Sequence, residues 1–388
     1  MAEKFSKFRD PGTGIQVFLT PVGGSRSWAS FLSGSLDGVG LIFMPVFILL
    51  GVVRGVVGAV FWGMYLVCGK SALLRVVLGA LGFISLRVEW VSPDTLNGRF
   101  GGGGGGRNKQ NLIKVKRQEV EKGDLVMANH SSYLDLVILA WLYPGLKFVL
   151  PVIDDGWKDD VDRADTVAGA GVGVGVGMRR IPKKNAMSAN TRIVTPSSPS
   201  STSSSNSTEI PILGYTILPL PKALRFIGSL PPSKSQLPNF TLHQDLNSTI
   251  KSYPSHPLAF FPEIVTSNNR ALLTLPNLPP TPPSELKSTH IVTLKYGLPT
   301  GTSTTSIYSV PTAGNSMLRH LMDIIFLSNP IRFVTIRQTT MVNQQESKNW
   351  PEDVGGFMSS LARLKRTSIA WWTKRDFLVM VNARNRRV

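Results

Sequence analysis

The stretch from Asp124 to Ile153 reads DLVMANHSSYLDLVILAWLYPGLKFVLPVI and decides the fold of this chain. DLVMAN at 124–129 is a short apolar run typical of a buried strand, and KFVLPVI at 147–153 predicts a second strand. Between them, SSYLDLVILAWLY at 131–143 has apolar residues at helical spacing. The order of strand, turn, helix and strand predicts the beginning of a βαβ unit.

Apolar segments of strand or helix length follow one another along the rest of the chain. Expected strands lie at 87–91, 111–116, 257–263, 290–296 and 331–337, a helical stretch at 317–328, and a further apolar segment at 214–232. Alternating strands and helices are typical of α/β domains. The sequence therefore predicts an α/β fold with a mixed, largely parallel sheet and flanking helices.

Changes in composition suggest four regions. We expect a polar N-terminal segment at 1–37, a membrane-associated segment at 38–86, the α/β domain at 87–340 and a basic C-terminal extension at 341–388. A low-complexity insertion at 166–209 interrupts the domain, because its alternating glycines at 169–177 and its serine-rich run at 196–208 cannot build a core. The six glycines at 101–106 predict a flexible hairpin tip, since no helix follows them.

The apolar run at 38–69 contains Arg54 as its single charge and is a candidate membrane segment, with a buried core helix of a soluble protein as the alternative. As a membrane segment it has two interpretations. One interpretation is a single tilted helix that carries Arg54. The other is a re-entrant hairpin with Arg54 at its tip, which fits Pro45, Gly51 and Gly55 slightly better because these residues loosen or kink helices. A second apolar stretch at 72–86 has Arg75 near its start and is expected at the membrane interface rather than across the membrane.

The chain has 42 Lys and Arg against 24 Asp and Glu, a net charge of +18. Such a surplus favours an anionic partner: nucleic acid, phospholipid headgroups or a phosphorylated substrate. The basic residues are scattered and no nucleic-acid-binding signature is present, so nucleic acid is not the expected partner. Cys68 is the only cysteine, which excludes an intrachain disulfide, and no HxxxH or HExxH pattern indicates a metal site.

His130 and Asp135, five residues apart, admit two interpretations. Ser132 and Asp135 match the S-x-x-D capping pattern, in which a hydroxyl and an acid satisfy the free amides of a first helical turn. Alternatively, a histidine just before a helix and an aspartate in its first turn can meet across the turn, as a general base and the acid that orients it. Spacing alone leaves both open.

NHSSYLD at 129–135, followed by FPEIVTSNNR at 261–270, resembles the motifs of the glycerolipid acyltransferase family, whose first motif is His, four residues, Asp. The resemblance covers about residues 86–340, and the continuation SNNRALL together with WWTKRDFL at 371–378 looks most like the fungal lysophosphatidic acid acyltransferases. It implies that His130 is the general base and that Asp135 orients it.

The resemblance also implies a substrate-binding set for the glycerol phosphate: Glu263, Thr266, Ser267 and Arg270, with Arg225 as the preferred arginine of the second motif over those in MRRIPKK at 178–184. Two positions depart from the family pattern. Ile264 stands where the family has Gly, and Thr266 stands where many members have Arg. A catalytically degenerate membrane protein of the same fold is therefore the first alternative. The second, suggested by charge alone, is a nucleic-acid-binding protein anchored to a membrane.

The implied reaction transfers an acyl group from acyl-coenzyme A to a lysophospholipid, with lysophosphatidate to phosphatidate as the favoured case. Acyl-coenzyme A is a co-substrate, no other cofactor is implied, and backbone amides at the helix start are expected to stabilise the oxyanion. The resemblance implies an endoplasmic reticulum membrane or lipid droplet location with the active site facing the cytosol. C-terminal basic residues would favour the anionic leaflet: Lys365, Arg366, Lys374, Arg375, Arg384, Arg386 and Arg387.

Overall fold

The computed structural model describes residues 2–21, 38–93, 119–156, 209–299, 304–310, 316–326, 331–341 and 347–385. Several predicted features lie outside these ranges: the strand at 111–116, the glycine runs at 101–106 and 169–177, the arginines of 178–184, the serine-rich run at 196–208, and Arg386 and Arg387.

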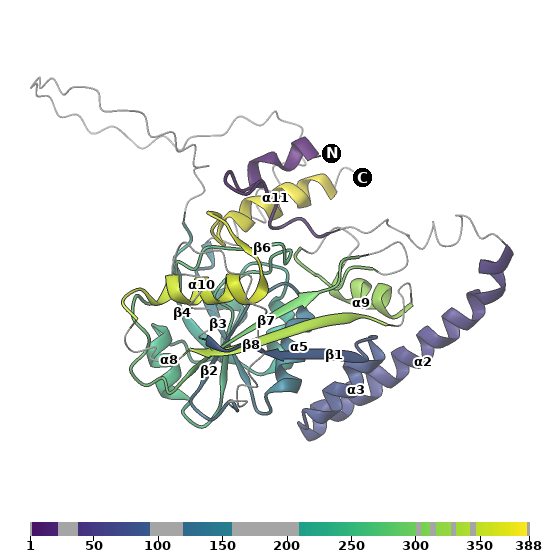
Figure 1. The fold of residues 1–388 in the computed structure, drawn as a ribbon, viewed down its shortest axis with the longest axis horizontal. Helices are drawn as coiled ribbons and strands as arrows, with labels where there is room; N and C mark the ends of the chain where they lie inside the picture. Colours follow the sequence, from purple (N-terminus) through teal and green to yellow (C-terminus); the bar gives the residue numbers. More distant parts are fainter. Residues whose placement is uncertain are drawn as a thin grey trace, which may run out of the picture.

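Seven of the described strands form one sheet in the order β1-β8-β7-β2-β5-β3-β4 (Figure 1). Their bounds are β1 Ser85–Trp90, β2 Leu125–Ala128, β3 Lys147–Ile153, β4 Ile212–Leu218, β5 Leu258–Phe260, β7 Thr289–Tyr296 and β8 Phe333–Met341. The pairs β7/β2, β2/β5, β5/β3 and β1/β8 are parallel, whereas β7/β8 and β3/β4 are antiparallel. The predicted mixed, largely parallel sheet is confirmed. A short second sheet pairs β6 (Ala271–Leu272) with β9 (Lys365–Arg366).

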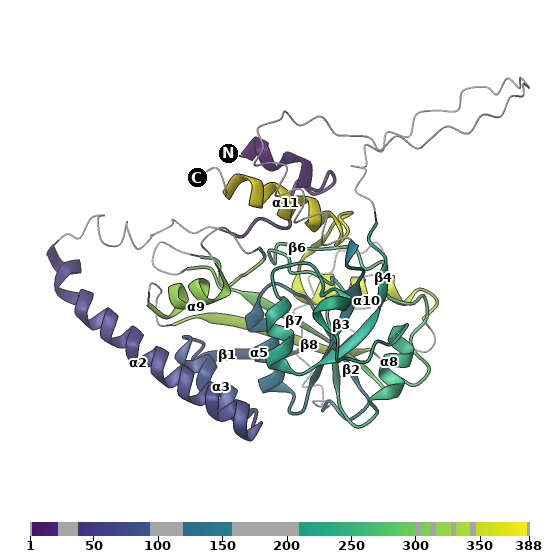
Figure 2. The same ribbon diagram turned by 180° about the vertical axis from the view of Figure 1, so that it is seen from behind.

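Helices cover both faces of the sheet (Figures 1 and 2). Helices α3 (Ala72–Ala80), α5 (Tyr133–Leu142) and α9 (Met317–Phe326), with the short α7 (Leu220–Ala223), contribute to one core cluster, whereas α8 (Leu246–Ser252) and α10 (Trp350–Ala362) contribute to another. Strand β2 feeds both, because Val126 and Ala128 join the first cluster and Leu125 and Met127 the second. A strand buried on both faces explains why this stretch is apolar at every position.

The apolar N-terminal run is one continuous helix, α2 (Gly38–Cys68), so the hairpin alternative is not realised. Arg54 lies at no tip: its Nε donates to the Ala80 carbonyl at 2.8 Å and its Nη1 to the Ile325 carbonyl at 3.0 Å, and these carbonyls belong to the last turns of α3 and α9. By length and composition, Ile48–Cys68 is the one described helix that could cross a membrane.

The segment at 72–86 differs from its expected interfacial placement. Its helix α3 buries Leu74 and Leu78 in the first core cluster, and its last residues begin strand β1. The reason is packing: α3 lies between α2 and α5, so its apolar side chains meet protein.

The two ends of the described chain lie together (Figures 1 and 2). The N-terminal 3-10 helix η1 (Ala2–Phe8) packs on α11 (Thr373–Asn385), with the rings of Phe8 and Phe377 5.2 Å apart. Both belong to a third apolar cluster that includes Ile264 and Val265. The regions expected as a polar N-terminal segment at 1–37 and a basic extension at 341–388 thus pack against the domain itself, and β8 runs across the expected boundary at residue 340.

Candidate active site

His130 lies in the turn that joins β2 to α5, at the carboxyl end of a strand in the parallel part of the sheet. Ser132 is the N-cap of α5: its Oγ accepts from the Leu134 amide at 3.3 Å, and the Asp135 carboxylate accepts from the Ser132 amide at 2.8 Å. The capping interpretation is therefore correct for Asp135.

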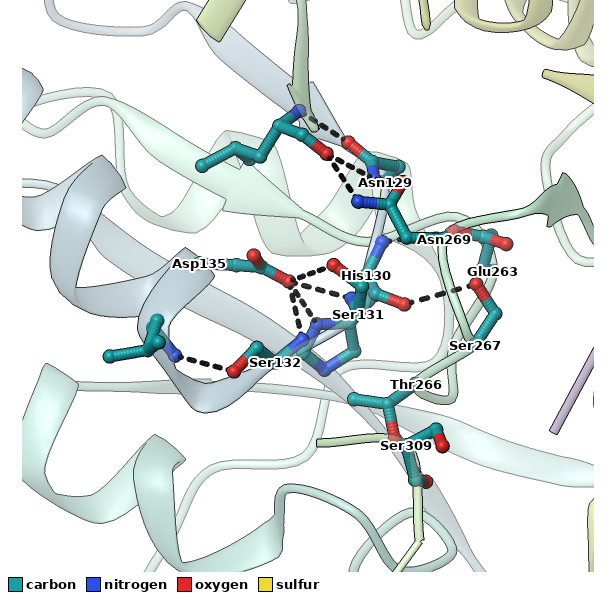
Figure 3. A network of polar contacts seen from close by, with 12 residues as sticks. Asn129, His130, Ser131, Ser132, Asp135, Glu263, Thr266, Ser267, Asn269 and Ser309 are labelled. Atoms are coloured by element: carbon teal, nitrogen blue, oxygen red, sulfur yellow. Dashed lines mark hydrogen bonds and ion pairs between the residues drawn. The ribbon is translucent and has the colours of Figure 1, made fainter. Parts of the chain in front are cut away.

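The same carboxylate also faces the histidine (Figure 3). Oδ2 of Asp135 lies 3.5 Å from Nδ1 of His130 and accepts from the Ser131 amide at 2.6 Å. Its other oxygen, Oδ1, accepts from the Tyr296 hydroxyl at 2.5 Å. The two interpretations of the pair are compatible, because one buried carboxylate caps the helix and approaches the imidazole.

The expected oxyanion donors at the helix start are already engaged. The amides of Ser131 and Ser132 donate to Asp135, and the Leu134 amide donates to the Ser132 hydroxyl. An acid at the third helical position takes the donors that a substrate oxyanion would need. These three amides therefore serve the cap, and an oxyanion role for the Tyr133 amide of the same turn stays a prediction.

The His130 ring is 4% exposed and lines a cavity, and it stacks on the Phe261 ring with centroids 4.1 Å apart. Nδ1 is turned to Asp135 at ion-pair distance without a well-aligned hydrogen bond. The ion pair of the ring is at Nδ1, so Nε2, on the other edge of the ring, is not paired with the Asp135 carboxylate. Burial lowers the pKa of His130, although Asp135 acts in the opposite direction, so the ring is neutral at pH 7. A neutral imidazole is the form that can take a proton.

Glu263 holds the histidine turn from the neighbouring loop after β5. Its Oε2 accepts from the His130 amide at 2.9 Å and its Oε1 from the Leu273 amide at 3.1 Å. Burial raises the pKa of Glu263 to about 7. In this conformation the carboxyl group contacts backbone amides rather than the cavity.

Thr266 and Ser267 continue this loop and are also turned toward protein (Figure 3). The Ser267 amide donates to the His130 carbonyl at 2.8 Å, and the Thr266 hydroxyl donates to the Ser309 carbonyl at 2.8 Å. The structure thus brings three residues of the expected substrate-binding set to the histidine turn. Glu263 and Ser267 brace that turn, whereas Thr266 bonds to Ser309. Substrate binding by the three residues stays a prediction.

Arg270 and Arg225, the two arginines of the expected set, are exposed and do not line the cavity at His130. None of the described residues around this cavity is a lysine or an arginine. Arg270 immediately precedes strand β6, and its amide donates to Asn268 Oδ1 at 3.2 Å. The structure therefore does not gather the expected phosphate contacts with the His–Asp pair.

The cavity itself is small, about 30 Å³, which is room for about one water molecule. Phe226, Ile227 and Phe261 contribute apolar walls. Ile264 completes them from the loop at 261–267, which is called the FPE loop below. Ile264 has a φ of +64°, in the left-handed region that glycine adopts freely. The position therefore has a backbone conformation that favours glycine over isoleucine.

Several site residues were not found from the sequence. Tyr296 on β7 donates its hydroxyl to Asp135. On the same strand, the Leu294 amide donates to Asn129 at 2.7 Å, and the Leu294 carbonyl accepts from Asn269 at 3.0 Å. Of these three residues, only Asn269 could have been suspected from the sequence, because an asparagine in a run of turn-forming residues tolerates the left-handed conformation that it adopts here, with a φ of +58°.

A second His–Asp pair provides a contrast. His290 Nε2 lies 3.1 Å from Asp124 Oδ2 near the amino ends of β2 and β7, and its Nδ1 meets the Thr340 hydroxyl at 3.0 Å. Both ring nitrogens are thus satisfied and the ring is 1% exposed. His290 is a core histidine, whereas His130 has a nitrogen free to face the cavity.

No group of three or more potential metal ligands occurs among the described residues. Comparisons with known protein families, with curated proteins and with solved structures find no match for this chain.

Proposed function

We propose that this chain is an acyl-coenzyme A-dependent O-acyltransferase that acylates a lysophospholipid, with lysophosphatidate as acceptor and phosphatidate as product. One observation carries the proposal: a buried His130 lies between the Asp135 carboxylate and a cavity. A base backed by a fixed acid and open on its other nitrogen is the arrangement that proton abstraction from a hydroxyl requires.

In the proposed reaction, Nε2 of His130 takes the proton of the acceptor hydroxyl as its oxygen attacks the thioester carbonyl. Asp135 keeps the Nδ1–H tautomer and stabilises the imidazolium that forms. The proton then passes to the departing coenzyme A thiolate, so no covalent enzyme intermediate is needed. Substrate entry requires that the cavity widen, because binding sites for molecules of this size hold on the order of 300–1,000 Å³.

A membrane location follows from the surface of α2 in this proposal. One face of the helix packs on α3 and α9, and the opposite face is apolar and exposed: Ile48, Leu49, Val52, Val53, Val56, Val60, Met64 and Val67. Arg54 is on the packed side, so the exposed face presents no charge to lipid. We infer attachment to the endoplasmic reticulum or lipid droplets, with the site on the cytosolic side near the anionic leaflet.

The alternative is a catalytically degenerate protein of the same fold. Two observations favour it: the expected arginines lie outside the cavity, and Ile264 adds a β-branched wall where the family has Gly. This alternative predicts a folded, membrane-bound protein that acylates no lysolipid.

The deciding experiment incubates membranes containing the protein with oleoyl-coenzyme A and a panel of lysolipids, and identifies products by mass spectrometry. His130→Ala should lower transfer by about 10²–10⁴-fold, the contribution of a general base. His256→Ala is the matched control, because this histidine is half-buried in the loop before β5 and contacts Ser255 rather than the site.

Equal transfer by the unaltered protein and the His130→Ala variant would exclude His130 as the base. Absence of transfer to every acceptor, by protein shown to be folded and membrane-bound, would favour the degenerate alternative.

A further inference from the structure

Lys374, expected among the residues that face the membrane, is buried inside the protein. It lies in the first turn of α11 with 0% of its surface exposed. Its Nζ donates to the Thr266 carbonyl at 3.0 Å and to the Thr266 hydroxyl oxygen at 2.7 Å. A long side chain from the C-terminal helix thus ends on the FPE loop.

Stability does not explain a lysine at this position. Nζ bonds to the two oxygens of Thr266 and to no carboxylate among the described residues, and burying a lysine amine without an ionic partner is destabilising, whether it keeps its charge or loses its proton. A lysine in the first turn also opposes the helix dipole. An apolar side chain of similar length, such as methionine, would satisfy the packing without these costs.

What Lys374 holds is the segment that braces the catalytic turn. Thr266 lines the cavity, and its neighbour Ser267 donates its amide to the His130 carbonyl. Three residues before Thr266, Glu263 accepts from the His130 amide. Both backbone hydrogen bonds to His130 from this loop therefore lie within three residues of the contact with Lys374.

We propose that Lys374 is a positioning residue, which fixes the loop from Glu263 to Ser267 and through it the place of His130 in the cavity. The proposal rests on the proposed function for its catalytic consequence but not for its structural one. It gives the C-terminal helix a role at the site, although α11 contributes no residue to the cavity lining.

The electrostatics of the site are consistent with this role. The charged or titratable groups around His130 are Asp135 on α5, Glu263 on the loop after β5 and Lys374 on α11, with Tyr296 of β7 behind Asp135. Burial lowers the pKa of Lys374 well below its ordinary value, while Glu263 acts to raise it. A positive charge on Lys374 lowers the pKa of His130, which favours the neutral imidazole.

The test uses the full chain with Lys374→Met, which keeps the length and removes the donors. Lys365→Met is the matched control, since Lys365 is exposed on β9. In hydrogen–deuterium exchange read by mass spectrometry, peptides covering 261–270 and 128–135 should exchange faster in Lys374→Met than in the unaltered protein. In Lys365→Met the same peptides should exchange at the rate of the unaltered protein. Thr266→Val removes the hydroxyl that accepts from Lys374 and donates to the Ser309 carbonyl, but it keeps the contact of Nζ with the Thr266 carbonyl. It should show a smaller increase confined to 261–270.

Kinetics give a second readout. Lys374→Met should lower kcat at least tenfold with KM within twofold, because the loop from Glu263 to Ser267 no longer fixes the position of His130. Unchanged exchange in both peptides would overturn the proposal, as would an unchanged kcat in an active enzyme.

Two controls keep the outcomes separate. If Lys374→Met does not fold, the exchange of Thr266→Val decides, and no increase at 261–270 overturns the proposal. If the unaltered protein transfers no acyl group, the proposed function fails and the exchange data alone decide the structural role of Lys374.

Discussion

Ile264 combines a φ of +64° with a buried side chain, and the two effects oppose each other. An L-residue in the left-handed region is destabilised by about 1–2 kcal/mol, and a β-branched side chain is among the least suited to it. Burial of an isoleucine side chain contributes about 1.5–3 kcal/mol in return. Here the side chain packs in the third apolar cluster, so Ile264 is a compromise between backbone strain and packing.

Replacing Ile264 separates these two contributions. Ile264→Ala loses the packing but keeps the strain, whereas Ile264→Gly loses both. We therefore expect Ile264→Gly to be more stable than Ile264→Ala by about 1 kcal/mol, the reverse of the usual order for these residues. Chemical denaturation in detergent measures it. Greater stability of the Ala variant would contradict the strained backbone at this loop.

Glu263 links stability to pH. Its pKa of about 7 in the fold lies above the ordinary 4.5, so its contribution is fully present below pH 4.5 and is lost as pH rises through about 7. The difference in unfolding free energy between the unaltered protein and Glu263→Gln should therefore decrease by about 3 kcal/mol from low to high pH. Denaturant melts at a series of pH values measure this slope. A difference that grows with pH would show that Glu263 is ionised and stabilising.

At the scale of elements, the sequence predicted those strands and helices that consist of uninterrupted apolar runs. Strands β2, β3 and β7 and helix α5 were placed correctly, because uninterrupted apolar runs leave few alternatives. The link from Tyr296 to Asp135 could not be predicted, since it joins residues 161 positions apart. The hairpin expected around Gly51 and Gly55 failed for a related reason: these glycines serve helix contacts rather than a turn.

Gly51 allows α2 to approach α9. A Cβ added there would lie 2.3 Å from Cδ1 of Phe326, whereas one added at Gly63 meets nothing within 4 Å. Gly51→Ala should lower stability by about 1–3 kcal/mol through overpacking, which exceeds its gain in helix propensity. Gly63→Ala, the matched control, should be neutral or stabilising by up to about 1 kcal/mol.

Thermal unfolding in one detergent compares these two variants directly. Adding Phe326→Ala to Gly51→Ala should recover part of the loss by making room. Equal melting temperatures for Gly51→Ala and Gly63→Ala would show that α2 does not dock on α9 in this way.

At the scale of the whole molecule, composition concealed how far the fold extends. The C-terminal 341–388 reads as basic and polar, yet Trp350, Met358 and Trp371 are fully buried. Isolated aromatic residues in a charged segment give no periodic signal, so their burial becomes visible only when the partner surfaces are known. The polar N-terminal segment also packs on α11, and its sequence gives no periodic signal of that contact either.

Truncation tests whether the C-terminal region is part of the fold. A chain ending at Met341 would remove α10 and α11 and expose the apolar surfaces of the second and third clusters. We expect loss of cooperative unfolding and rapid cleavage by trypsin within the remaining domain. A truncated protein that melts cooperatively near the temperature of the full chain would show that 341–388 is a separable extension.

Asp135 has two roles, as the cap of α5 and as the partner of His130, and together they have a consequence for heat inactivation. Because one carboxylate both begins α5 and faces the imidazole, fraying of a single helical turn would release the base while the sheet stayed intact. Loss of turnover would then precede loss of structure on warming, and rapid cooling would restore it, since the core would never have opened. For the proposed acyltransferase we therefore expect inactivation to be a reversible local event, separate from global melting.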